Sequence, residues 1–155
     1  MAGSRTFRIG CVFVLCACVS AFAQTTTPEL LPVAEQRQLA QRFVDERLAV
    51  WRQRLNLEDW RISAVLTPLN ELAPKTLGGI RWDKTKKSAV IWVLDPSDYA
   101  LPFREMLNDM ELTIVHELVH LELASLPRSQ ANRGGQERAI SGIAEAMLKL
   151  DRGKQ

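Results

Sequence analysis

The segment TIVHELVHLEL at residues 113–123 constrains the fold more than any other part of the chain. It contains both histidines of the 155-residue sequence, four positions apart, with a glutamate directly after the first. Most of its other residues are apolar, so the segment is expected to be a largely buried helix. Ionisable groups in such a helix cost several kcal/mol unless they are paired or bind an ion. The segment therefore predicts that His116, Glu117 and His120 share one site.

Helical spacing suits these three side chains to a catalytic metal. Relative to His116, a step of about 100° per residue places His120 at about 40° and Glu117 at about 100° around the helix. Both imidazoles can then reach one ion, and the carboxylate can reach a water molecule beside it. His-Glu-x-x-His is the zinc-peptidase signature for this reason. We expect one Zn²⁺ per chain on His116 and His120, with Glu117 as the general base.

The first 23 residues are typical of a cleaved export signal. Arg5 and Arg8 precede an apolar run at residues 9–23 that ends in Ala-Phe-Ala. This run is shorter than the stretch of about 20 residues that a membrane-spanning helix needs. We expect residues 1–23 to be a signal peptide and residues 24–155 a single exported domain, periplasmic or secreted, with no stable membrane insertion. A lipid anchor on Cys18 is an alternative, because LCAC loosely resembles a lipoprotein box.

Removal of this leader changes the composition that matters for function. All three cysteines leave with it, and the 20 basic residues fall to 18, equal to the 18 acidic residues. A chain without a basic excess is not suited to general nucleic-acid binding. We therefore expect no nucleic-acid partner, no disulfide and no thiolate ligand, and the oligomeric state is left open.

A catalytic zinc ion normally takes three protein ligands, so one more is required. With no further histidine and no cysteine in the mature chain, that ligand is expected to be a carboxylate. Glu137 and Glu145 both lie in a helix predicted at residues 136–151. Glu137 falls on an apolar flank of this helix, whereas Glu145 lies between basic residues. We assign Glu137 as the third ligand and keep Glu145 as the alternative.

The remaining patterns predict an α+β fold. Residues 34–57 are expected to form a long amphipathic helix, with Leu39, Phe43, Leu48, Trp51 and Leu55 on its apolar side. Alternation indicates a strand at 59–68, and residues 78–82 and 88–96 suggest a hairpin. The run at 88–96 is continuously apolar and predicts an inner strand covered on both faces. Residues 96–107 are expected to be irregular or briefly helical, and 108–127 to form the central helix, which would begin at Asn108.

HELVH, followed by the ERAI and AML segments between residues 137 and 148, resembles the minimal gluzincins, which are small zincin-type zinc metallopeptidases. The resemblance covers roughly residues 78–150. It implies a small antiparallel sheet of about three strands, packed on a long N-terminal helix and a central active-site helix and followed by a C-terminal helix. It also implies an endopeptidase with a peptide or protein substrate, in which the strand at 78–82 faces the cleft.

Two other functional classes use the same sequence differently. The chain could be a catalytically inactive zincin-like protein that binds metal or peptide, or a helical scaffold without metal. An open coordination position and the presence of Glu117 favour catalysis, because a purely structural zinc site needs neither. Metal analysis and peptidase assays separate the three classes.

Overall fold

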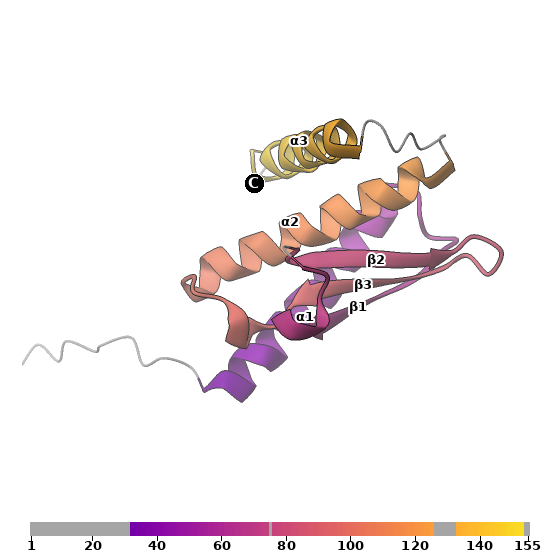
Figure 1. Ribbon diagram of the computed structural model, residues 1–155. Helices are drawn as coiled ribbons and strands as arrows, with labels where there is room; N and C mark the ends of the chain where they lie inside the picture. Colours follow the sequence, from indigo (N-terminus) through magenta and orange to yellow (C-terminus); the bar gives the residue numbers. More distant parts are fainter. Residues whose placement is uncertain (1–31, 75, 126–132, 154–155) are drawn as a thin grey trace, which may run out of the picture. The chain divides into compact units, whose positions relative to one another are not determined.

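The computed structural model describes residues 32–74, 76–125 and 133–153, which belong to one compact unit (Figure 1). The predicted signal peptide at 1–23 lies outside the described residues. In the described part of the chain, no helix is long and apolar enough to cross a membrane. The helices and strands are α1 (Val33–Arg54), β1 (Arg61–Thr67), β2 (Gly78–Asp83), β3 (Ser88–Leu94), α2 (Phe103–Glu122) and α3 (Arg133–Arg152).

The three strands form a mixed sheet with β3 in the centre (Figure 1). β2 and β3 pair antiparallel, as predicted for a hairpin, with Ile80 opposite Ile91. β1 and β3 pair parallel, with Ala64 opposite Ile91. The predicted α+β class is confirmed, whereas the prediction of an antiparallel sheet is wrong. The chain leaving β1 crosses to the far edge of β3 before β2 begins, so β1 gains a parallel neighbour.

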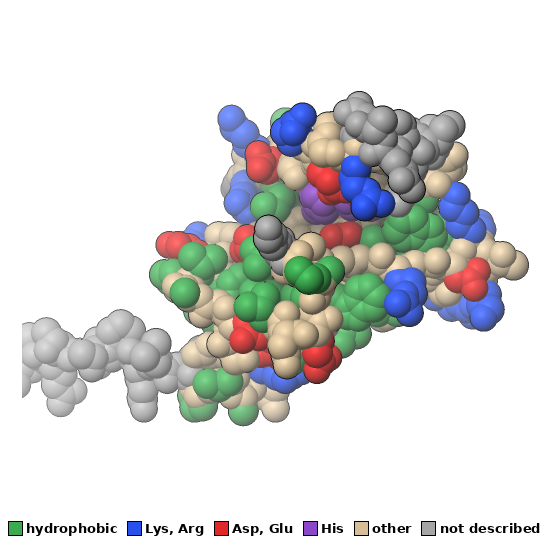
Figure 2. Space-filling model, in the orientation of Figure 1, with side chains coloured by type: hydrophobic (Ala, Val, Ile, Leu, Met, Phe, Trp, Pro, Cys, Tyr) green, Lys and Arg blue, Asp and Glu red, His purple; other side chains and the backbone are tan. Residues whose placement is uncertain are grey.

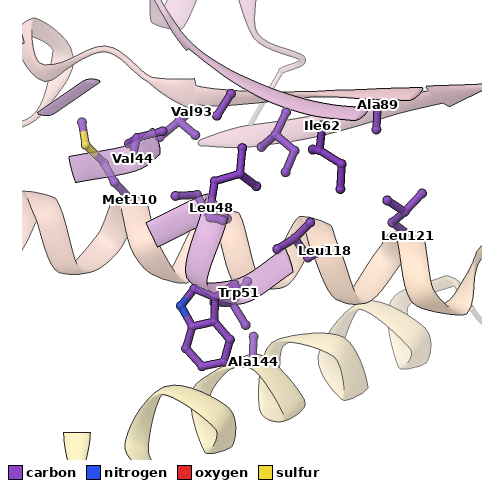
Figure 3. Packing of buried hydrophobic residues seen from close by; sticks show 14 of the residues in the cluster. Val44, Leu48, Trp51, Ile62, Ala89, Val93, Met110, Leu118, Leu121 and Ala144 are labelled. Carbon is purple, nitrogen blue, oxygen red and sulfur yellow. The ribbon is translucent and has the colours of Figure 1, made fainter. Parts of the chain in front are cut away.

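The core lies between the sheet and the helices, with α2 at its centre. One face of the sheet packs on α1 and α2, and α3 packs on α2 away from the sheet (Figures 1 and 3). The inward side chains of the sheet are Ile62, Ala64, Leu66, Ala89, Ile91 and Val93. From α2, Met110, Ile114 and Leu118 are fully buried. Full burial of one such side chain stabilises the fold by about 1.5–3 kcal/mol, so α2 is fixed firmly.

The outer face of the sheet is partly exposed. Val65 on β1 and Val90 on β3 are 45% and 37% exposed. Beside them, the Trp92 ring lies under the guanidinium of Arg81 at 5.6 Å. The prediction that the strand at 88–96 is covered on both faces is therefore wrong within the described residues. Its apolar run includes outward-facing residues that are covered only by their neighbours in the sheet.

Helix boundaries differ from the predicted ones. α2 begins at Phe103, and the amide of Met106 donates to the carbonyl of Pro102. Asn108 is therefore inside the helix and does not start it. The reason is that Met106 and Met110, four residues apart, continue the buried face of α2 toward its N-terminus.

α1 also buries a slightly different face from the predicted one. Its buried residues are Ala40, Val44, Leu48 and Trp51. Leu39 and Phe43, which were predicted to face the core, are only partly buried. The smaller side chains of Ala40 and Val44, each one position further along the chain, allow α1 to approach α2 closely.

Gly78 brings β2 against α2 with no space for a side chain. A Cβ at this position would lie 2.4 Å from Cγ2 of Thr113 and 2.8 Å from the carbonyl oxygen of Trp92. We expect Gly78→Ala to lower the free energy of unfolding by about 1–3 kcal/mol, because the strand and the helix must separate. Urea unfolding measures this change.

Gly79→Ala is the matched control for Gly78→Ala. Its Cβ would meet only a carbon of the Trp92 ring, at 3.6 Å, which is an ordinary contact. We expect this variant to stay within about 1 kcal/mol of wild type. Equal stabilities of the two variants would contradict the close approach at Gly78.

Candidate metal centre

α2 and α3 bring the predicted metal ligands together. His116 and His120 lie one turn apart on α2, and Glu137 lies near the start of α3. Figure 2 shows the histidine side chains in a hollow between α3 and the sheet. The two histidines and Glu137 form a group that could hold a metal ion, and no other such group was found among the described residues.

The ligand atoms of this group form a nearly equilateral triangle. Nε2 of His120 lies 3.1 Å from Nε2 of His116 and 3.1 Å from Oε2 of Glu137. Nε2 of His116 lies 3.5 Å from the same Oε2. Ligand atoms bound tetrahedrally to zinc at about 2.0–2.1 Å are separated by about 3.4 Å. The donor types and their spacing therefore both fit a divalent zinc ion.

A fourth side chain approaches the second ring nitrogen of His116, the one that is not in the ligand triangle. Ser141 lies one turn after Glu137 on α3, and its Oγ is 3.5 Å from Nδ1 of His116. This distance is longer than the usual range of about 2.7–3.2 Å for an N–H···O hydrogen bond, so the contact is weak. Histidine ligands of metals usually donate their second ring N–H to an oxygen acceptor, most often a carboxylate, a backbone carbonyl or water, which fixes the tautomer and the ring orientation. Ser141 is thus placed to keep Nε2 of His116 available for the ion.

Glu117 lies in the same cavity as the ligand triangle. The cavity has a volume of about 320 Å³ and is also lined by Gly78 and Thr113. Glu117 is only 8% exposed. Burial, and to a smaller extent the negative charge of Glu137, raises the pKa of Glu117 to about 7. A carboxyl group with a pKa near neutrality can both accept and return a proton at physiological pH.

Glu117 should make the metal-free protein less stable as the pH rises. Its pKa increases on folding from 4.5 to about 7, so between these values the folded state binds the proton more tightly than the unfolded state does. The free energy of unfolding of the metal-free protein therefore falls between pH 4.5 and about 7. Above about pH 7 this loss of stability stays constant. We expect metal-free Glu117→Gln to exceed wild type by up to about 3 kcal/mol at pH 8 and by much less near pH 5.

Urea unfolding in the presence of a chelator, at both pH values, measures this difference. The comparison with the Gln variant cancels the contribution of groups that do not interact with Glu117. A difference between the proteins that is the same at pH 5 and pH 8 would contradict a raised pKa for Glu117.

The structure brings together the residues that the sequence assigned to the site. Glu145, the alternative third ligand, instead lines a neighbouring cavity together with Leu148. Glu137 is 48% exposed at its side chain, so the apolar flank predicted around it is only partial. Sequence reasoning missed Ser141, although its four-residue spacing from Glu137 placed both on one helical face.

No protein-family model, curated protein or solved structure matches the chain.

Proposed function

We propose that the protein is an exported zinc-dependent endopeptidase of the minimal gluzincin type. The observation that carries this proposal is the triangle of His116, His120 and Glu137 atoms at zinc spacing, with Glu117 buried beside it. Three protein ligands leave a fourth coordination position open, as catalytic zinc sites require and structural sites do not. The signal-like residues 1–23 support export.

The proposed chemistry assigns a role to each side chain. His116 and His120 would bind zinc through Nε2 as neutral imidazoles, and Glu137 would bind through a carboxylate oxygen. Bound zinc supplies Lewis acidity, which polarises a peptide carbonyl and lowers the pKa of water toward 7. A carboxylate oxygen of Glu117 would accept a proton from the attacking water and then deliver it to the leaving amine nitrogen.

β2 is a suitable surface for an extended peptide. It pairs with β3 along one edge, and no other described strand pairs with its second edge. Gly78, at the start of β2, lines the same cavity as the metal ligands. A peptide that adds to this edge through main-chain hydrogen bonds would pass over the site. A second cavity, of about 450 Å³, shares Asp109 and Leu112 with the first and lengthens the available cleft.

Digestion of a peptide library tests the proposal. Residues 24–155 are purified, loaded with zinc and incubated with peptides, and the products are identified by mass spectrometry. We expect internal cleavage that stops after chelation and returns when zinc is added. Zinc binding without any cleavage would favour the inactive metal-binding alternative, and absence of zinc binding would contradict the metal site itself.

A further inference from the structure

A cluster of charged side chains around two largely buried carboxylates joins the end of α3 to the other two helices, fourteen positions from Glu137 along α3. We name this cluster the charge clamp. Its members are Arg47, Trp51 and Arg54 from α1, Glu111 from α2, and Asp151 and Arg152 from α3.

Two carboxylates form the centre of the charge clamp. Glu111 is 5% exposed and accepts hydrogen bonds from Arg47 and from Nε1 of Trp51, the latter at 2.9 Å. Asp151 accepts from Nη2 of Arg47 at 2.9 Å and from Nη2 of Arg54 at 2.7 Å, and its side chain is 9% exposed. Arg47 therefore bridges α2 and α3, and Asp151 ties the end of α3 to α1.

The rest of α3 is held by a narrow apolar stripe. Its buried residues are Ile140, Ala144 and Leu148, spaced four apart along one line of the helix. The middle one, Ala144, is fully buried, and Trp51 extends from α1 toward this turn of α3 (Figure 3). Ile140 and Leu148, four residues to either side of Ala144, are 1% and 5% exposed, so the stripe holds both halves of α3 on α2 but does not by itself fix the rotation of the helix about the stripe.

Ala144 lies halfway between the metal ligand and the charge clamp. It is seven positions from Glu137 on one side and seven positions from Asp151 on the other. At a rise of 1.5 Å per residue, each arm of the helix is about 10 Å long. Because a helix moves as a rigid element, a rotation of α3 about this stripe that displaces Asp151 also displaces Glu137.

We propose that Asp151 is a positioning residue for the metal centre, acting through α3 to hold Glu137 at the correct distance from the two histidines. The inference rests on the proposed function only in requiring that zinc binds at this site. Metal ligands must lie within about 0.2 Å of their ideal distances. Loss of the contacts that Asp151 makes at the end of α3 therefore weakens zinc binding, although Asp151 itself is remote from the metal ligands.

The experiment measures zinc affinity by competition with a chromophoric chelator, and ligand geometry by the visible absorption of the Co²⁺-substituted protein. We expect Asp151→Asn to weaken zinc binding by about tenfold, the lower end of the loss that follows removal of a group hydrogen-bonded directly to a metal ligand. Its Co²⁺ bands should shift and lose intensity. Asp151→Glu keeps the carboxylate and should recover most of the affinity and the wild-type spectrum.

A matched control separates positioning from loss of stability. Ile62→Val shortens a core side chain on β1, does not touch α3, and typically costs about 0.5–1.5 kcal/mol. We expect it to keep wild-type zinc affinity and the wild-type Co²⁺ spectrum. Wild-type affinity in Asp151→Asn, or an equal loss in Ile62→Val, overturns the positioning role while leaving the metal site intact. A wild-type protein that binds no zinc overturns both.

A milder variant covers the case in which Asp151→Asn does not fold, as judged by circular dichroism. Arg54 contacts Asp151 and is 40% exposed at its side chain, so Arg54→Gln should be tolerated. We expect about a threefold loss of zinc affinity in this variant. Unchanged affinity and an unchanged Co²⁺ spectrum overturn the inference.

Discussion

Replacement of Glu117 by Gln should abolish peptide hydrolysis while one zinc ion per chain remains bound. Gln has nearly the same size and fills the same space in the cavity, but its amide cannot accept a proton from water. General-base catalysis contributes roughly 10²–10⁴-fold to the rate, so kcat should fall by at least that factor. KM should change little, since Glu117 is assigned no role in holding the peptide. Steady-state kinetics with a peptide found by library digestion, together with metal analysis, measures both effects.

Glu122→Gln is the matched control for Glu117→Gln. Glu122 lies on the same helix and undergoes the same chemical change, but it lines a separate cavity with Asp59 and Lys84. We expect wild-type kcat and wild-type zinc content in this variant. Full activity in Glu117→Gln would refute the assignment of the base. Loss of zinc from Glu117→Gln would mean that Glu117 is itself a ligand.

The grouping of the candidate metal ligands was predictable because most of the relevant sequence pattern is local. His116, Glu117 and His120 lie within five residues of one helix, so the helical period alone fixes their relative directions. Glu137 is on another helix, but the sequence has no other histidine and no cysteine after residue 23, which left few candidates. The prediction needed no knowledge of how α2 and α3 pack, because the chemistry of zinc restricts the third ligand to a small set of residue types.

The sheet topology and the charge clamp were not predictable in the same way. The alternation Ile62, Ala64, Leu66 indicates a strand with one buried face, but the pattern is the same for parallel and antiparallel pairing. The direction of β1 depends on how the chain crosses to β2, which no local pattern records. Likewise, Arg47 and Asp151 are ordinary charged residues in their own helices. Their pairing becomes apparent only when α1 and α3 are both packed on α2.

Replacement of Glu137 by Ala should remove most of the bound zinc. The site would retain His116 and His120, and two imidazoles alone bind zinc much more weakly than two imidazoles and a carboxylate. Loss of a partner outside the ligand set typically costs about 10–100-fold in metal affinity, and loss of a ligand should cost at least the upper end of that range. Zinc content after dialysis and competition with a chelator measure the effect.

Because Glu137 is partly exposed, loss of zinc in Glu137→Ala can be distinguished from loss of stability. Its side chain is 48% exposed, so alanine there removes little buried surface and should leave the free energy of unfolding of the metal-free protein within about 0.5 kcal/mol of wild type. If Glu137→Ala loses zinc but keeps its stability, the loss shows that Glu137 is a ligand and does not result from unfolding. Glu145→Ala, two turns further along α3, is the matched control and should keep its zinc. Normal zinc in Glu137→Ala with depleted zinc in Glu145→Ala would transfer the third-ligand assignment to Glu145, and α3 would then have to sit on α2 in a different register.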